Sequence, residues 1–276
     1  MKINHFTKIL SAAFFMCFHS VFSMAALPMG STGENFRFQK TYAAIIAISD
    51  YQYSPAGTGG DLNYTDDDAR KFYQYLVSPT GGKVAPQNVV LLINQAATKN
   101  AILKMLGHVF SKAKENDRVI LYYSGHGQPG YIIPSDAHDA KTLISYDSIK
   151  RIFKKCRAKT KLCFIDACNS DSIKSPGRKT NSNAAGNKKT NASVVIMVSS
   201  QSDQSSVEDS NLKQGAFSYF LLKGLKGEAD TDMDKTVTIE ELHKYVYFHV
   251  KKYTFGKQVP HTFGRFDLDM PVALLN

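Results

Sequence analysis

Residues 119–127, VILYYSGHG, predict a buried strand that ends in a histidine between two glycines. The run VILYY is apolar and does not alternate, which is typical of a strand covered on both faces. Glycine weakens a strand but lets another backbone come close. His126, between Gly125 and Gly127, is therefore either an incidental turn residue or a group that something must approach closely.

A second strand end carries a thiol. Residues 161–166, KLCFID, form another apolar run, and Cys168 follows two residues later. Ligands bind beyond the carboxyl ends of strands in open α/β sheets. If the two strands are neighbours, His126 and Cys168 meet at that edge, where an imidazole activates a thiol and protonates a leaving amine. Taken singly, each residue has a purely structural explanation: His126 as a turn residue and Cys168 as a core residue.

Strands and helices alternate along the chain. We expect further strands at 41–49, 88–93 and 192–199, and helices at 66–77, 98–115, 145–156, 215–225 and 239–250. Thr98 is an expected N-cap, and Ser145 opens the third helix. This order predicts an α/β fold with a mostly parallel sheet of about six strands and helices on both faces.

The first 25 residues have the composition of a secretory signal peptide. Lys2 and Lys8 precede the apolar run SAAFFMCFHSVF, and small residues follow at Ser23 and Ala25. We expect export to a periplasm or the medium, with cleavage near Ala25, and no membrane span in the mature chain. The remaining residues, 26–276, are long enough for one domain with a substantial core.

The chain is basic. Removing Lys2 and Lys8 lowers the formal charge from +10 to +8. Much of the excess lies in one polar stretch, and we find no basic helix interleaved with aromatic residues, so we expect no nucleic-acid partner. Cys156, Cys163 and Cys168 remain after cleavage, an odd number that leaves at least one free thiol. Cys156 and Cys163 either pair or are buried as small apolar residues.

Residues 171–191, DSIKSPGRKTNSNAAGNKKTN, interrupt the alternation. The segment is nearly free of apolar side chains and cannot bury enough surface to order itself. Loops of this length are usually functional or disordered. We therefore predict a flexible basic linker here.

Together these motifs resemble the caspase-like cysteine peptidases, most closely the metacaspase-like and bacterial caspase-homologue branch. YYSGHG and FIDACNS look like the family's histidine and cysteine motifs, and the flanks IIAISDY, LNYTDDDARKF and YIIPSDA extend the likeness. The resemblance implies a caspase-like fold, a dyad of nucleophile Cys168 and proton-transfer partner His126, and an oxyanion hole from the backbone N–H groups of Gly127 and Cys168. Asn169-Ser170-Asp171 departs from the His-Ser-Gly that follows the cysteine in many relatives.

The resemblance also implies a pocket for the residue before the scissile bond. Asp166 matches an acid two residues before the cysteine, Asp68 matches the Asp-Ala pair of the helix entry, and Ser124 matches a further pocket position. Two carboxylates in one pocket favour a cationic side chain, so we expect protein or peptide substrates cleaved after Arg or Lys. The alternative is that Asp166 orients a loop and Asp68 is a solvated acid at a helix start.

The family divides into large- and small-subunit regions, which here correspond to about 38–170 and 192–276, with the basic linker 171–191 between them. A protease that cuts after basic residues is expected to cut itself in this linker, at one of its cations. These are Lys174, Arg178, Lys179, Lys188 and Lys189. The alternative is a tolerated surface insertion.

A last motif, ADTDMDKTVTIEEL, has the spacing of a calcium-binding loop. Five of its residues occupy positions 1, 3, 5, 7 and 12 of an EF-hand: Asp230, Asp232, Asp234, Thr236 and Glu241. Lys235 stands where the sharp turn needs glycine, so the stretch is either a calcium site or an acidic turn before a helix. We expect the peptidase chemistry itself to need no cofactor.

The sequence thus predicts an exported cysteine endopeptidase with a preference for basic residues. A rival is a non-catalytic caspase homologue that serves as a binding or scaffold module. Another is a calcium- or polyanion-binding surface protein. The chain keeps both His126 and Cys168, which favours the enzyme.

Overall fold

A six-stranded sheet forms the centre of the computed structural model, which describes residues 38–53, 60–168, 193–200 and 206–275. Its strand order is β12-β8-β7-β3-β1-β2. The strands are β1 (Thr41–Ala47), β2 (Val89–Ile93), β3 (Arg118–Ser124), β7 (Thr160–Asp166), β8 (Ser193–Val198) and β12 (His261–Arg265). All pairs are parallel except that of β12 with β8. The expected mostly parallel sheet is confirmed.

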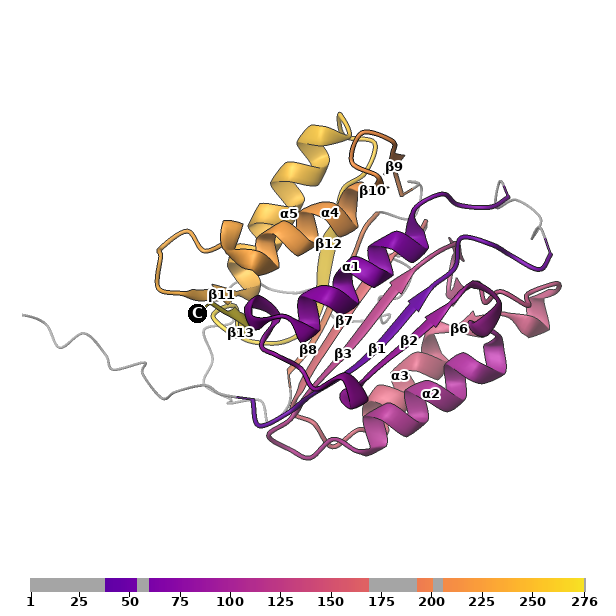
Figure 1. The fold of residues 1–276 in the computed structure, drawn as a ribbon, viewed down its shortest axis with the longest axis horizontal. Coiled ribbons are helices and arrows are strands. Elements are labelled where there is room, and N and C mark those ends of the chain that lie inside the picture. The colour runs from indigo at the N-terminus through magenta and orange to yellow at the C-terminus, as the bar shows by residue number, and fades with distance from the viewer. Residues whose placement is uncertain (1–37, 54–59, 169–192, 201–205, 276) are drawn as a thin grey trace, which may run out of the picture. The chain divides into compact units, whose positions relative to one another are not determined.

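Helices cover both faces of this sheet (Figure 1). They are α1 (Thr65–Val77), α2 (Lys99–Ser111), α3 (Tyr146–Lys155), α4 (Ala216–Lys223) and α5 (Ile239–Tyr253). Alternate side chains of β1, β3 and β7 enter two separate cores, one with α2 and α3 and the other with α1, α4 and α5. Since every residue of these three strands is buried, their sequences are mostly apolar, with the polar residues near the strand ends.

Side-chain caps begin three of the helices. The hydroxyls of Thr98, Ser145 and Thr238 accept the backbone N–H groups of Ala101, Ser148 and Glu241. The caps at Thr98 and Ser145 were expected. The helix after Thr98 ends at Ser111 rather than near residue 115, because Asp117 accepts the Lys114 N–H at 2.8 Å and closes a turn before β3.

Short strands outside the central sheet form three small sheets, and the sequence did not predict them. They are β4 (Gly127–Gln128), β5 (Tyr131–Ile132), β6 (Ile144–Ser145), β9 (Glu208–Asp209), β10 (Gln214–Gly215), β11 (Thr236–Thr238) and β13 (Pro271–Leu274). None carries a long apolar run. A π-helical turn, Gly224–Glu228, continues α4.

One-turn 3-10 helices complete the described chain at Pro79–Gly81, Pro86–Asn88, Asn94–Ala96 and Ala140–Thr142. Cys156 and Cys163 are buried free thiols, so they are not paired but serve as small apolar residues. None of the described helices is long and apolar enough to cross a membrane. The predicted signal peptide and the linker 171–191 lie outside the described residues.

Candidate active site

The two sequence motifs meet at the carboxyl ends of β3 and β7. The strands pair in register from Arg118 with Thr160 to Ser124 with Asp166. One further bond, from the Gly125 N–H to the Asp166 carbonyl at 3.1 Å, extends the ladder. His126 and Cys168 follow directly. Both border a cavity of about 190 Å³, whose lining also includes Thr65, Asp68, Ser124, Asp166, Val207, Glu208 and Gly215.

Two buried tyrosines hold the backbone of His126. The His126 N–H donates to the Tyr51 hydroxyl at 2.7 Å, and the Tyr123 hydroxyl donates to the His126 carbonyl at 2.6 Å. A Cβ on Gly125 would lie 2.8 Å from the Tyr123 hydroxyl and 2.9 Å from that of Tyr51. Glycine is needed at 125 because both hydroxyls pack against its Cα.

A backbone carbonyl fixes the tautomer of the His126 ring. Its Nε2 lies 2.6 Å from the Gly60 carbonyl oxygen, which can only accept, so Nε2 carries the proton and Nδ1 is the basic nitrogen. Burial lowers the pKa of His126, against the opposing effects of the Gly60 hydrogen bond and the charges of Glu208 and Asp61. The neutral imidazole that a general base requires is therefore favoured.

Gly127 lies against the backbone of the cysteine loop. A Cβ at Gly127 would lie 2.7 Å from the Cys168 carbonyl oxygen and 3.0 Å from the Ala167 Cβ. Ala167 is itself held, since its N–H donates to the Ser199 hydroxyl and its carbonyl accepts from the Ser200 hydroxyl at 3.0 Å. The two segments expected to form an oxyanion hole are thus adjacent, and Cys168 is partly exposed.

The three residues expected in the substrate pocket are all buried beside this cavity. Asp68 is 1% exposed, Ser124 2% and Asp166 4%. The neighbouring Asp67 is exposed, so α1 turns Asp68 inward and Asp67 to solvent. The reading of Asp68 as a solvated helix-start acid is therefore wrong.

Hydrogen bonds orient both carboxylates. Asp68 accepts from the Gly215 N–H and from the Gln214 side chain, each at 2.9 Å. Asp166 accepts through Oδ2 from the Ser218 hydroxyl at 2.7 Å. Its Oδ1 is buried without a hydrogen bond of normal geometry.

Burial governs the charge of this pair. It raises the pKa of Asp68 well above the ordinary range, and the charge of Asp166 raises it further. Burial also raises the pKa of Asp166, although the hydroxyls of Ser218, Ser206 and Ser199 oppose the shift. Among the described residues that border the cavity, no Lys or Arg neutralises the two acids. A cationic ligand would do so.

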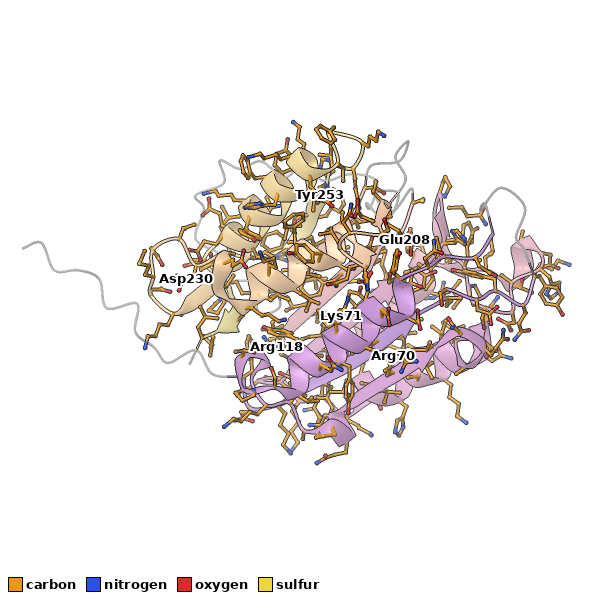
Figure 2. All side chains as sticks on the ribbon, turned by 45° about the horizontal axis from the view of Figure 1, so that its top comes forward. Arg70, Lys71, Arg118, Glu208, Asp230 and Tyr253 are labelled. Atoms are coloured by element: carbon orange, nitrogen blue, oxygen red, sulfur yellow. The ribbon has the colours of Figure 1, made fainter. Side chains whose placement is uncertain are left out.

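Glu208 is a cavity residue that sequence reasoning missed. Its carboxylate accepts the backbone N–H groups of Asn63 and Tyr64 at 2.8–3.1 Å, which ties β9 to the start of α1. Figure 2 shows Glu208 at this end of α1. An acid in the polar run SVEDS gives no sequence signal for a contact with residues so far away in the chain.

Tyr51, Gly60, Gln214, Gly215 and Ser218 were missed as well. Each contributes a backbone group, a hydroxyl or an amide. Only Gly215, the first residue of the helix predicted over 215–225, offered a signal, and that signal indicates a helix start rather than a pocket wall.

The acidic loop lies apart from the cavity. Figure 2 shows Asp230 on the opposite side of the view from Glu208. Carboxylate oxygens of Asp230, Asp232 and Asp234 lie within 4.8 Å of one another, and Lys235 adopts the left-handed φ of 68°. The Thr236 N–H donates to Asp234 at 2.7 Å.

Glu241, the twelfth position of the predicted calcium loop, is used otherwise. Its two carboxylate oxygens accept from Thr231 and from Thr238, the latter as a capping box of α5. Calcium binding stays a prediction, and it would require Glu241 to exchange these partners.

Several predicted residues lie outside the described part of the chain. They are the linker cations Lys174, Arg178, Lys179, Lys188 and Lys189, and the positions 169–171 where the family pattern is not kept.

Known proteins resemble this chain in sequence and in fold. A family model described as the caspase domain matches residues 40–266. A probable protease of a Desulfuromonadales bacterium is 31% identical over 153 residues, 47% of this chain and 18% of the relative. The chain thus corresponds to less than a fifth of that relative's length. A crystal structure of a Geobacter sulfurreducens protein shares the fold, with a TM-score of 0.59 at 19% identity over 86% of this chain and all of that one.

The family match and the protease relative support a peptidase. The match extends over most of the chain and includes both strand-end motifs, with His126 and Cys168. The protein therefore belongs to the caspase-domain family.

Proposed function

We propose that the protein is a cysteine endopeptidase that cleaves after Arg or Lys. One observation carries the proposal: His126 and Cys168 border the same cavity as two buried acids, Asp68 and Asp166. The first pair supplies a nucleophile and a base, and the second supplies a counter-charge for a cationic side chain.

The chemistry follows from the tautomer of His126. Nδ1 accepts the thiol proton as the Cys168 sulfur attacks the scissile carbonyl carbon. The protonated ring then donates that proton to the leaving amine, which breaks the C–N bond and leaves a thioester. Water, deprotonated by the same nitrogen, hydrolyses the thioester and restores the thiol. The N–H groups of Gly127 and Cys168 are the proposed donors to the transient oxyanion.

The preference for basic residues rests on charge balance in the pocket. Two buried carboxyl groups with raised pKa values are costly to ionise together. A guanidinium or ammonium group between them offsets that cost, whereas an aspartate side chain would add a third acid. Ser124, at the end of β3, supplies a polar wall of the same pocket.

Export and self-cleavage are part of the proposal and rest on sequence composition. Intact mass after incubation tests the second, with Cys168→Ala as the control. Cuts between 171 and 191 in the wild type alone are expected, and cuts in both proteins would contradict self-processing. Mass spectrometry of protein recovered from cells tests for removal of residues 1–25.

The rival proposal is a non-catalytic binding module of the same fold. Assays of the purified protein on fluorogenic peptides ending in Arg, Lys or Asp, with and without calcium, separate the two. We expect hydrolysis after Arg and Lys that is lost in Cys168→Ala and in His126→Ala. Hydrolysis that survives Cys168→Ala, or no hydrolysis after any residue, would contradict the enzyme.

A further inference from the structure

Helix α5 and the turn after it carry lysines and exposed phenylalanines on their outer surface. Lys244, Phe248 and Lys251 are spaced by four and three residues and share one side of α5. Lys252, Phe255 and Lys257 continue this surface. We name the six residues together the Lys/Phe face. All six are exposed, Phe248 by 56% and Phe255 by 93%.

The turn that carries Phe255 folds back onto the end of α5. The Phe255 N–H donates to the Lys252 carbonyl, and the Gly256 N–H donates to the Lys251 carbonyl at 2.8 Å. Phe255 therefore lies next to the last helical turn with its lysines. The opposite side of α5 is anchored in the core through Leu242, Val246 and Val250. The face is thus a fixed surface of the fold.

The backbone of Phe255 is strained. Its φ is 52°, in the left-handed region that glycine adopts most easily. The Phe255 side chain is almost fully exposed, so folding buries almost none of its apolar surface. Neither folding nor packing accounts for phenylalanine at this position. Phe255 is therefore an exposed apolar side chain that is free to contact a partner outside the molecule.

The charge of this region has one sign. From residue 242 to residue 266 the chain has no Asp or Glu, and its cations are Lys244, Lys251, Lys252, Lys257 and Arg265. Of the Lys/Phe face, only Lys244 forms an ion pair within the described chain, with Glu240. The outer side of α5 therefore combines lysines with aromatic residues, although the helix as a whole carries three lysines against two glutamates, Glu240 and Glu241.

We propose that the Lys/Phe face binds the surface of a bilayer that contains anionic lipids. Lysines gain from contact with anionic headgroups, and exposed phenylalanine rings enter the boundary between headgroups and acyl chains. A membrane surface accepts both at once on a convex helix. Binding to a membrane surface also explains why the two exposed phenylalanines protrude and are flanked by lysines.

A single-stranded nucleic acid fits the face less well. Base stacking needs ring faces that are free and close enough for neighbouring bases. The Lys252 Nζ already lies over the Phe248 ring, 5.6 Å from its centre. Phe255 lies seven residues further along the chain. A bilayer makes no demand on the spacing or the faces of the rings.

Vesicle sedimentation tests the proposal in a Cys168→Ala background, which prevents self-cleavage. We expect the protein to sediment with phosphatidylcholine vesicles that contain phosphatidylglycerol, and less so as salt rises. Phe248→Ser with Phe255→Ser, and Lys251→Glu with Lys252→Glu, should each weaken the phosphatidylglycerol-dependent binding by about tenfold or more. Residues 1–25 are the same in all variants and cannot produce this difference.

Matched controls use exposed residues elsewhere. Met233→Ser with Leu268→Ser removes two exposed apolar side chains, and Lys112→Glu with Lys114→Glu reverses two lysines near the end of α2. Both should bind as the parent does. Phe255→Gly adds an independent readout, because it should raise the melting temperature by relieving the strain while it weakens vesicle binding.

Two results would overturn the proposal. One is equal sedimentation of the parent and both variants of the face, each with an unchanged melting transition. The other is retention on a single-stranded oligonucleotide in place of the vesicles. Neither result bears on peptide hydrolysis, so this proposal and that of a peptidase stand or fall separately.

Discussion

Asp68 and Asp166 come from α1 and β7, yet their carboxylates face the same Cα atom, that of Gly215. A Cβ there would lie 3.1 Å from the Asp68 Oδ2 and 2.8 Å from the Asp166 Oδ2. The sheet and α1 therefore bring two acids together, and β10 leaves space between them.

Gly215→Ala should block the acidic pocket without straining the backbone. Gly215 has φ −66° and ψ 137°, which alanine adopts freely, but its methyl group would press on both carboxylates. We expect kcat/KM for an Arg peptide to fall by about tenfold or more. Gly107→Ala in α2 is the control, since its Cβ would meet nothing within 4 Å. An equal loss in both variants would exclude a pocket effect.

The preference for Arg should depend on pH. The raised pKa values of Asp68 and Asp166 mean that both acids take up protons at a higher pH than ordinary aspartates. As the pH falls, the pocket loses negative charge and kcat/KM for an Arg peptide declines more than that for its neutral citrulline analogue. The ratio of the two is the measurement. A ratio that does not change with pH would count against these acids as the pocket.

The citrulline peptide reports on His126 instead. Because burial lowers the pKa of His126, the acidic limb of its kcat/KM profile should lie below the ordinary histidine value of about 6.5. A limb well above that value would show that the imidazole is charged in the free enzyme.

Asp166→Asn should stabilise the fold and lower the peptidase activity. The pKa of Asp166 is raised in the fold, so its contribution to stability is greatest at low pH and is lost as the pH rises from the unfolded-state value toward the folded one. At neutral pH the variant should melt higher, by about 2–4 °C for each kcal/mol gained, and the gain should shrink near pH 4. Hydrolysis after Arg should fall.

The exposed Asp67 offers the control for that experiment. Asp67→Asn should change neither the melting temperature nor the activity appreciably. A lower melting temperature for Asp166→Asn would mean that the hydrogen bond from Ser218 outweighs the cost of burying the charge.

Tyr51→Phe should lower kcat more than it changes KM. The variant leaves the His126 N–H without its acceptor, at a cost of about 1–3 kcal/mol, and loosens the residue that must carry the proton. We expect kcat to fall on the order of tenfold. Tyr53→Phe is the matched control, because Tyr53 is 54% exposed. A change in KM alone would contradict a positioning role for Tyr51.

Calcium should raise the melting temperature if the acidic loop binds it. The effect should be lost in Asp232→Asn, because Asp232 supplies one of the three clustered carboxylates. Glu241→Ala should lower stability even without calcium, since it removes the side chain that completes the capping box with Thr238. A stabilisation that persists in Asp232→Asn would place the ion elsewhere.

The central strands and helices of the fold could be predicted because residues that are neighbours in the sequence specify them. β1, β3 and β7 are buried on both faces, and their sequences are therefore mostly apolar. Thr98 and Ser145 are residue types that indicate the start of the helices they cap. The strand β12 escaped notice because its sequence, HTFGR, is short and mixed. It is a strand only because β8 offers it an edge.

The sequence by itself determined the order of the elements, and the residues that follow β3 and β7. It could not decide that Asp68 faces inward while Asp67 faces solvent, that Gly60 orients the ring of His126, or that Glu208 ties β9 to α1. Those relationships join residues far apart in the chain through hydrogen bonds that no local sequence pattern specifies. Only packing around a common sheet brings such partners within reach, whereas a strand or a capped helix is specified by its immediate neighbours.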